Sequence, residues 1–330
     1  MASEAGTVGT GDRASRLMEA TLASIVAAAA PLIYAAVGEA ITERAGIINL
    51  SLDGSILLSA MSGFAIAYTT GSVGLGFVAA ALVSALVALV VAWSGISLRL
   101  NQVAVGFVLT LLGAALSSYL GEGFAHRPGP AVTPRPIPGL SEIPGIGKAL
   151  FGQNLSVYGS LALVIAAAWI LARHRFGLEL RAVGERPEAA HARGINVNRY
   201  RYGAAALGGA LVGVAGAAFS LDQKLGWSDG HTAGFGWIAL AIVIFGGWQP
   251  IRVALGCYLF GALQVVALRL QDRVPGLAQI LPSLPFPLMI FALVLVNAPA
   301  LRRLMGRSSR AVRWILPEAP AALGRNFAPE

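Results

Sequence analysis

The chain has 330 residues, of which 56% are hydrophobic and only 12% charged, and its formal net charge is +8. Soluble domains are about one-quarter charged, so this composition excludes an ordinary soluble globule. Six long runs contain no charged residue: 54–98, 100–121, 149–172, 202–221, 230–251 and 274–301. Because a membrane-spanning helix needs roughly 20 mostly apolar residues, the chain is predicted to be an all-α, polytopic transmembrane helical bundle.

The first 20 residues form a polar N-terminal tail. They lack both a cationic start and a small-residue cleavage site before the apolar stretch, so a cleaved signal peptide is not expected. A single transmembrane domain is then predicted over 21–301, followed by a basic C-terminal tail at 302–330. About nine spans, with a range of eight to ten, are predicted at 21–42, 47–69, 73–95, 103–121, 155–172, 203–222, 233–249, 252–271 and 284–300.

The positions of the basic residues predict the orientation. Of the 24 Lys and Arg residues, seven lie in 173–201 and five in 302–313, and the positive-inside tendency places both segments in the cytoplasm. The four spans between them are an even number, as this requires, and the N-terminus is then outside. The Pro-rich segment 121–154 becomes an extracytoplasmic loop. The sequence offers no module that interleaves arginines with stacking aromatics on a folded surface, so nucleic acid is not an expected partner.

An interrupted span is predicted at Gly38–Gly54, GEAITERAGIINLSLDG, where five polar residues enter apolar sequence: Glu39, Glu43, Arg44, Asn49 and Asp53. Polar groups at membrane depth normally face a cavity, a pathway or one another. A broken helix is tolerated there only where its free backbone groups are buried or line water. The segment is therefore predicted to be a broken helix that lines a pathway. The alternative, of equal weight, is a cytoplasmic turn in which Glu43 and Arg44 are solvated.

The segment Arg181–Arg201, RAVGERPEAAHARGINVNRYR, predicts a short helix on the cytoplasmic side. Pro187 suits a first helical position, Glu188 favours the positive end of the helix, and Gly194 can end it. Such a helix of about two turns is too short to be stable alone in water, so we expect it to dock onto a partner. The alternative is a helix resting on the bilayer with its arginines near lipid phosphates.

Three blocks resemble one family. EAAHARG, Glu188–Gly194, resembles the coupling-helix motif of permease subunits of ABC importers, and GERPEAAHARGIN is similar to the variant in the nucleoside and simple-sugar branch, of the branched-chain amino acid and ribose type. GIINLSLDGSILLSA, Gly46–Ala60, resembles an early motif of that branch. TAGFGWIALAIVIFGGWQP, Thr232–Pro250, is the third match. The family block often has a basic residue where this chain has Phe235.

The resemblance implies a permease like those of type II ABC importers, in a bacterial inner membrane with its C-terminus in the cytoplasm. It implies pairing with a second permease subunit, homologous or identical, with two ATP-binding subunits or domains and with an extracytoplasmic substrate-binding protein. ATP and Mg²⁺ would be bound by the partner ATPase, since this chain has no G-x-x-x-x-G-K-[ST] phosphate loop, so the chain itself is not expected to be an enzyme. The residues implied in coupling are Glu188, Ala189, Ala190, Arg193 and Gly194.

The branch resembled handles nucleosides and related bases, with simple sugars as the alternative. Neutral polar ligands of this kind require hydrogen-bonding groups and aromatic faces. The candidate pathway residues are Glu39, Asn49, Ser51, Asp53, Gly54, Phe107, Trp237 and Gln264. Phe107, Trp237 and Trp248 could line a pathway, and packing or a position at the lipid boundary is the alternative for all three.

Two other functions compete with an importer. An ion-coupled secondary transporter would use Glu39 and Asp53 as proton or sodium sites, but it leaves the helix at Glu188–Gly194 without a role. An intramembrane enzyme has less support, because the single Cys257 lacks a His neighbour in the sequence. The four histidines show no metal-ligand spacing either, so neither a catalytic nor a metal site is expected.

Overall fold

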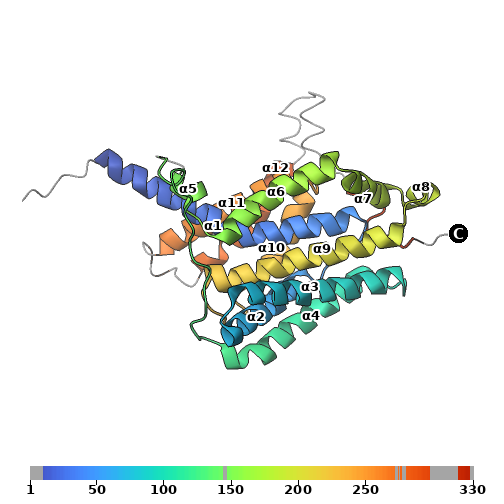
Figure 1. The fold of residues 1–330 in the computed structure, drawn as a ribbon, viewed down its shortest axis with the longest axis horizontal. Helices are drawn as coiled ribbons and strands as arrows, with labels where there is room; N and C mark the ends of the chain where they lie inside the picture. Colours follow the sequence, from blue (N-terminus) through green and yellow to red (C-terminus); the bar gives the residue numbers. More distant parts are fainter. Residues whose placement is uncertain are drawn as a thin grey trace, which may run out of the picture.

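All regular secondary structure in the described residues is helical. The structure is a computed structural model that describes residues 10–143, 147–271, 274, 276, 280–297 and 319–327 (Figure 1). This confirms the predicted all-α bundle. The helices are α1 Thr10–Arg44, α2 Leu52–Thr70, α3 Val73–Ile96, α4 Gln102–Gly121, α5 Gly147–Phe151, α6 Leu155–Arg173, α7 Arg175–Glu185, α8 Pro187–Ala192, α9 Val197–Ala218, α10 Phe235–Phe245, α11 Pro250–Gln271 and α12 Pro285–Asn297.

Seven helices in the described part of the chain are long and apolar enough to cross a membrane. They coincide with seven of the nine predicted spans. The other two predictions, 233–249 and 284–300, fall on α10, with 11 residues, and α12, with 13. At 1.5 Å per residue α10 is roughly 17 Å long, about half of a bilayer core. At the other end of the chain, α1 begins at Thr10 and so extends into the predicted polar tail.

The bundle has two distinct ends. The beginning of α1, α5 and the Pro-rich segment lie at one end, whereas α7 and α8 lie at the other, close to the C-terminus (Figure 1). The amide of Ala322 donates a hydrogen bond to the carbonyl of Gly184 at 2.9 Å. Segment 173–201 and the described part of the C-terminal tail therefore lie at the same end of the bundle. An even number of spans between them requires this. The basic stretch Arg302–Arg313 lies outside the described residues.

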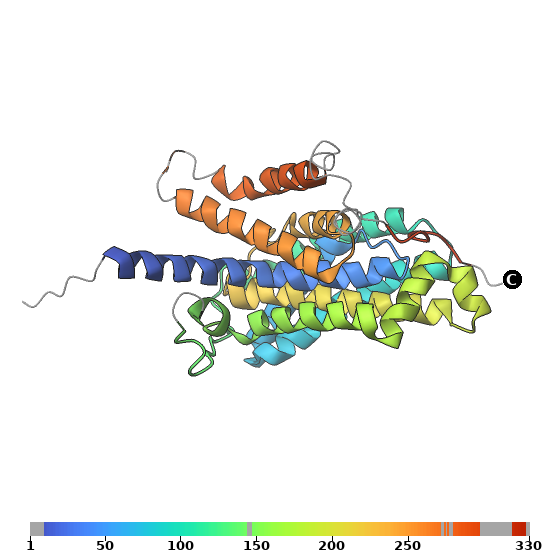
Figure 2. The same ribbon diagram turned by 90° about the horizontal axis from the view of Figure 1, so that it is seen from above.

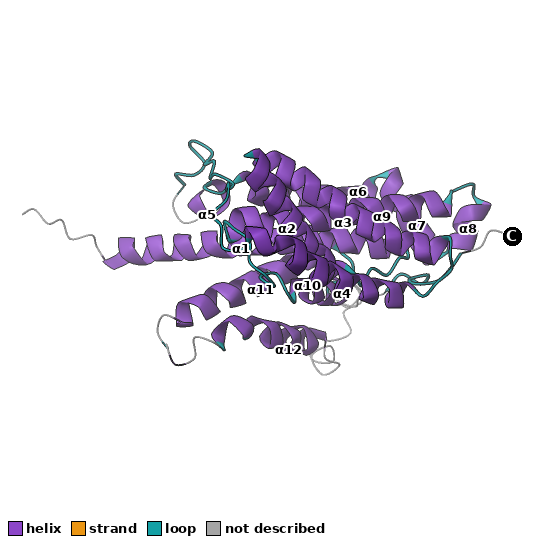
Figure 3. Cartoon of the chain, turned by 90° about the horizontal axis from the view of Figure 1, so that it is seen from below, coloured by secondary structure: helices purple, strands orange, loops and turns teal. Residues whose placement is uncertain are grey.

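Small residues bring α1 and α9 together at the centre of the bundle. A Cβ atom on Gly38 of α1 would lie only 2.7 Å from the carbonyl oxygen of Gly208 on α9. The apolar core around this contact includes Leu32, Ile33 and Val212, each at most 1% exposed. Lipid tails provide no hydrophobic drive between helices, so close backbone packing of this kind holds them together. On one flank, α11 packs against α1, and α12 packs against the outer side of α11 (Figures 2 and 3).

The Pro-rich segment is irregular, as its prolines predict, but it is packed against the bundle. The amide of His126 donates to the carbonyl of Trp227 at 3.1 Å, and that of Val132 donates to the carbonyl of Leu221 at 3.0 Å. Trp227 is only 2% exposed under this cover. The segment therefore caps one end of the bundle.

Candidate functional site

The helix break between α1 and α2 is buried. The helix α1 ends at Arg44, Gly46 has a φ of 92° in the left-handed region, and α2 begins at Leu52. Ala45, Ile47, Asn49 and Ser51 are each at most 1% exposed. Glu43, just before the break, is only 4% exposed. The alternative of a solvated turn is therefore wrong for Glu43. The interruption is a buried, non-helical link between α1 and α2, which are each long enough to cross a membrane, and its role in a pathway stays a prediction.

Side chains of α4 satisfy backbone groups that the break leaves free. The amide of Ile48 donates to Oε1 of Gln102 at 2.9 Å. The hydroxyl of Thr110 donates to the carbonyl of Leu50 at 2.7 Å. Because an unpaired backbone group costs several kcal/mol inside a membrane protein, these two polar side chains permit an irregular segment at this position.

Arg201 and the C-terminal segment complete the support of the break. Arg201 is 1% exposed; its Nε donates to the carbonyl of Ala45 at 3.2 Å and its Nη1 to the carbonyl of Arg325 at 2.9 Å. The carbonyl of Gly46 accepts a hydrogen bond from the amide of Gly324 at 2.9 Å. One buried guanidinium thus joins the break to residues nearly three hundred positions away in the chain.

Asp53, in the first turn of α2, holds the start of α10. Its Oδ1 accepts hydrogen bonds from the amides of Gly234 and Gly236, both at 2.9 Å. A carboxylate is stabilised at a helix N-terminus, where the first amides have no partner within the helix. A Cβ atom on Gly236 would lie 2.3 Å from the backbone nitrogen of Asp53, so only glycine permits this approach. Asp53 positions α10 against the break.

Asn49 and Ser51 bond to each other. Oδ1 of Asn49 accepts from the amide of Ser51 at 3.2 Å and from its hydroxyl at 2.5 Å. The hydroxyl of Ser51 also lies 3.3 Å from that of Ser55. Such local side-chain bonds substitute for helical ones and stabilise a turn. In this structure both side chains shape the break.

Two acidic residues lie one turn apart near the end of α1. Glu43 accepts a hydrogen bond from Nε1 of Trp248, and Nε of Arg44 donates to the carbonyl of Trp248 at 2.8 Å. Trp248 is 4% exposed, so it packs inside the protein rather than at a lipid boundary. Glu39 is fully buried; Asn49 lies beside it, but neither carboxylate oxygen makes a hydrogen bond of normal geometry with any described residue. An unpaired buried carboxyl is the most unusual polar group at the break.

Two of the predicted pathway residues have other surroundings. Gly54 packs α2 against α4, since a Cβ atom there would lie 2.4 Å from the carbonyl oxygen of Thr110. Gln264 lies on α11 one turn beyond Gly261, which contacts Ala29 of α1. Ala29 is ten residues, or roughly 15 Å, from Glu39 along the helix. The structure therefore does not bring Gln264 to the break.

Phe107 and Trp237 form an exposed aromatic pair beside the break. Their ring centroids are 6.5 Å apart, and they are 49% and 40% exposed, respectively. Trp237 follows Gly236, which Asp53 holds. Phe235, which replaces the basic residue common in the family block, points elsewhere: its ring packs against Phe219, with 4.5 Å between centroids, in an aromatic cluster.

The predicted short helix is confirmed as α8, Pro187–Ala192; its cytoplasmic side stays a prediction. Pro187 is its first residue, and Gly194, with a φ of 83°, follows its end. Four of the five predicted coupling residues are exposed: Glu188, Ala189, Arg193 and Gly194. Ala190, the fifth, is 3% exposed and packs with Val183, Val197 and Phe327. The helix therefore has an anchored face and a free face.

Two elements at this end are not predicted by the sequence patterns. The first is α7, an amphipathic helix inside segment 173–201. The second is the C-terminal segment 319–327: Phe327 stacks edge-on against His191, with 5.6 Å between centroids, and Nδ2 of Asn326 donates to the carbonyl of Arg99 at 3.2 Å. The apolar residues around Gly324, after a basic stretch, were the signal for a docked segment.

His231 is a partly buried titratable group at the opposite end of the bundle. Its Nδ1 lies 2.8 Å from the carbonyl oxygen of Ser228. Burial, with a smaller contribution from the positive charge of Lys224, lowers the pKa of His231 from its usual 6.5 to about 4. The neutral imidazole is therefore the stable form at neutral pH.

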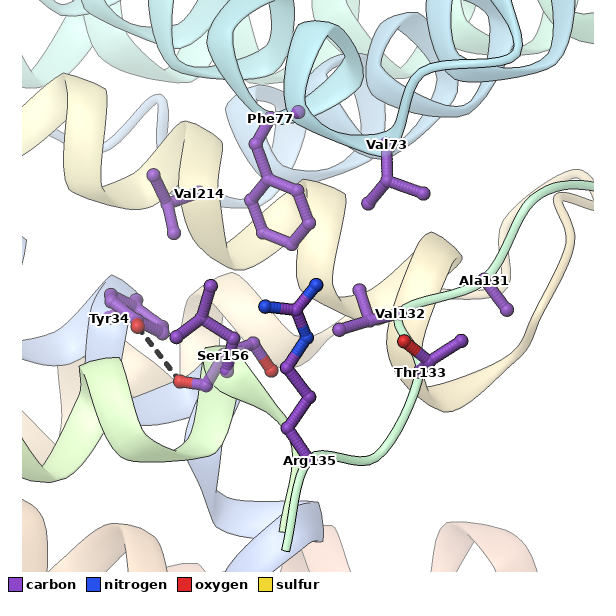
Figure 4. A pocket seen from close by; sticks show the side chains of 11 residues that line it. Tyr34, Val73, Phe77, Ala131, Val132, Thr133, Arg135, Ser156 and Val214 are labelled. Atoms are coloured by element: carbon purple, nitrogen blue, oxygen red, sulfur yellow. Dashed lines mark hydrogen bonds between the residues drawn. The ribbon is translucent and has the colours of Figure 1, made fainter. Parts of the chain in front are cut away.

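A cavity of about 480 Å³ opens at this same end, between α1, α3, α6, α9 and the Pro-rich segment. The side chain of Arg135 reaches into it below Phe77, and Oη of Tyr34 donates to the carbonyl of Ser156 at 2.8 Å (Figure 4). None of the predicted pathway residues lines this cavity.

A family model described as "Branched-chain amino acid transport system / permease component" matches residues 21–296. The chain belongs to this permease family. The chain is 35% identical over 300 residues to a nucleoside ABC transporter permease protein of Lactococcus lactis, covering 86% of this chain and 94% of the relative. It is 29% identical to a guanosine ABC transporter permease protein of Bacillus subtilis, covering 85% and 90%.

A third relative, from Haloferax volcanii, is named as a candidate glucose ABC transporter permease; it is 40% identical, covering 78% of this permease and 79% of the relative. No solved structure matches the chain. The resemblance inferred from three sequence blocks is confirmed: this is a multi-pass membrane protein and a transport subunit of an ABC importer of the nucleoside and sugar type. The ion-coupled carrier is thereby set aside. Membership implies an ATPase, a substrate-binding protein and another permease subunit as partners.

Proposed function

We propose that this permease imports a nucleoside or a nucleobase-like compound. The observation that carries the substrate class is the similarity, over 94% of its length, to a relative named as a nucleoside permease, together with the similarity to one named for guanosine. A simple sugar is the second candidate, because another relative is named for glucose.

The pathway runs along the face that carries Phe107 and Trp237. These rings are the exposed aromatic surface next to the break, and planar bases stack on such surfaces. Asp53 supports the pair through α10, while Asn49 and Ser51 shape the segment beneath. A second permease subunit, homologous or identical, closes this face from the other side.

The free face of α8 is the docking surface for a partner ATPase. Six helical residues do not hold together in water, yet α8 presents Glu188, Ala189 and Arg193 to solvent. Two ATP-binding subunits or domains bind ATP and Mg²⁺, and ATP hydrolysis takes place there. Their closure moves α8, and the motion continues into α9, which packs against α1, α2 and α3.

This arrangement assigns each end of the bundle to one side of the membrane. The α8 end and the C-terminus face the cytoplasm of a bacterial cell with this subunit in its inner membrane. The opposite end, with the Pro-rich segment, faces the substrate-binding protein. The distribution of basic residues supports this orientation, since seven of 24 Lys and Arg lie in segment 173–201.

The test is uptake by the complete importer in proteoliposomes, with labelled guanosine, uridine and glucose in separate assays. Uptake of a nucleoside that excess glucose does not reduce supports the proposal; uptake of glucose alone overturns the substrate class.

Phe107→Leu and Trp237→Leu test the pathway face in the same assay. We expect each variant to raise the half-saturating substrate concentration several-fold, because base–aromatic stacking contributes roughly 1–3 kcal/mol. Trp169→Leu is the matched control, since Trp169 is 59% exposed on α6, away from the pair. Equal uptake by all three variants would remove Phe107 and Trp237 from the pathway.

A further inference from the structure

A second cavity, of about 670 Å³, lies at the α8 end of the bundle. Its walls are α7, the link from α8 to α9 and the first turns of α9. Three arginines line it: Arg175, Arg193 and Arg199. None of these arginines lines the helix break or the cavity in Figure 4.

The cavity carries an excess of positive charge. Its one acidic residue is Glu179, which accepts hydrogen bonds from the hydroxyl of Tyr200 and from Nε of Arg175, the latter at 2.7 Å. These two bonds lower the pKa of Glu179, so it is ionised and already engaged. Arg193 and Arg199 form no ion pair with any residue that the structure describes. Two guanidinium groups therefore remain available to an anion.

The cavity lies at the level where the spanning helices end. The helix α6 ends at Arg173 and α9 begins at Val197. Trp169, one turn before the end of α6, is 59% exposed, and tryptophan concentrates at membrane–water interfaces. Leu178 of the amphipathic α7 is 49% exposed, although it belongs to a helix rich in charge. An amphipathic helix with an exposed leucine beside such a boundary lies in the headgroup region.

We propose that this basic cavity binds the phosphate group of an anionic phospholipid in the adjacent leaflet. Guanidinium groups bind phosphate oxygens through paired hydrogen bonds, and they remain charged at every physiological pH. The exposed Leu178 and the ring of Phe176, which stacks on Tyr200 at 5.4 Å, give the acyl chain an apolar surface next to the phosphate. The bound lipid bridges α7 to the link that contains Gly194, and so steadies the approach to α8.

The cavity shares Arg193 and Gly194 with the proposed coupling residues, but lipid binding requires neither the transported substrate nor the ATPase, so it is tested on the purified full-length permease. The protein is placed in nanodiscs of phosphatidylcholine with or without phosphatidylglycerol. Lipid retained after transfer to detergent is counted by native mass spectrometry, and thermal unfolding is followed in parallel. We expect selective retention of phosphatidylglycerol and a raised melting temperature in its presence.

Arg193→Gln and Arg199→Gln are expected to lower retention of phosphatidylglycerol about fivefold each, since one basic group near an anionic surface contributes about 1 kcal/mol. Arg173→Gln is the matched control, because Arg173 is exposed at the same boundary but does not line the cavity. Arg199→Lys keeps the positive charge but lacks the paired N–H donors of a guanidinium group. It serves as a second variant if Arg199→Gln folds poorly.

Three results would overturn the proposal. The first is equal retention of phosphatidylglycerol by the wild type and both Gln variants. The second is displacement of the lipid by an equal concentration of inorganic phosphate, which would make this a site for a soluble anion. The third is no lipid preference by the permease alone, combined with weaker ATPase binding by the Gln variants. That result would assign the arginines to an acidic protein surface.

Discussion

The helix break and α8 are both short polar interruptions in an apolar chain, yet their surroundings are opposite. At the break, Asn49, Ser51 and Asp53 are buried and form their hydrogen bonds with other groups of the protein. Glu188 on α8 and Arg193 directly after it are exposed. The comparison shows that polar residues have two roles in this membrane protein. Buried, hydrogen-bonded polar side chains stabilise the fold, whereas exposed polar side chains are available to bind a partner.

The two regions are physically joined. Arg201 and the C-terminal segment contact the break at Ala45 and Gly46, and Phe327 in the same segment packs against Ala190 of α8. A displacement of α8 therefore reaches the break through this segment as well as along α9. Changes at the break are expected to lower the free energy of unfolding more than changes on α8.

The largest effect is expected from Asp53→Leu. It removes two charge-assisted hydrogen bonds to the amides of α10, each of which contributes roughly 1.5–3 kcal/mol, so the loss is about 4 kcal/mol. Thermal and denaturant unfolding in detergent measure it. Asp53→Asn keeps an acceptor and is expected to lose about half as much. Wild-type stability of Asp53→Leu would show that the carboxylate serves the pathway instead.

A smaller loss of stability is expected when His231 becomes protonated at low pH. Because burial holds its folded-state pKa near 4 while the unfolded chain binds a proton near pH 6.5, stability is full above pH 6.5 and declines as the pH falls towards 4. The decline amounts to about 2 kcal/mol once partial solvent screening is allowed for. Unfolding measured across this pH range in wild type and His231→Gln tests it; the same slope in both would contradict the assignment.

The next effect is expected from Phe327→Ala. The side chain is 8% exposed and fills a small cluster at the edge of the bundle, so its loss costs about 1 kcal/mol, below the range for a central core residue. Hydrogen exchange should then rise at the amides of Ala322 and Gly324. Phe291→Ala, which alters a phenylalanine 65% exposed on α12, is the control and should leave both amides protected.

Small effects on stability, with the largest on coupling, are expected from Glu188→Arg and Gly194→Glu. Surface changes at Glu188 stay within about 0.5 kcal/mol. Gly194 has open space around it but a positive φ, so its substitution costs about 1 kcal/mol. In the complete importer both variants should lose at least about tenfold in ATP-driven uptake, a loss of roughly 1.4 kcal/mol in coupling. Normal uptake and normal substrate-stimulated hydrolysis would refute a docking role for α8.

Much of the fold was predictable because its causes are local. Charge-free runs of sufficient length marked the seven long helices, and Pro187 followed by alanines and Gly194 marked α8. The predicted count of nine is approximate, since α10 has only 11 residues and is shorter than a bilayer, while α12 is described over 13 residues, up to Asn297. Hydropathy averages over a window and does not separate a short helix from the apolar turn beside it.

The site was less predictable, because its contacts are distant in the sequence. That Glu39, Asn49 and Asp53 belong to one break follows from their spacing. That Asp53 holds α10 depends on Gly234 and Gly236, more than 180 positions away. The docking of Phe327 beside Ala190 and the three arginines of the basic cavity depend in the same way on how α7, α9 and the C-terminal segment meet.

By itself, the sequence determined the class of protein, the long helices, the polar interruption between α1 and α2 and the short helix α8. Each of these follows from composition and from spacing within about 20 residues, because lipid solvates any sufficiently apolar segment and helices satisfy their own backbone. Only the tertiary structure decided which polar groups form hydrogen bonds within the protein. Whether a buried carboxylate caps a helix, faces a tryptophan or lies unpaired depends on what packs against it, and close packing of distant helices sets that environment.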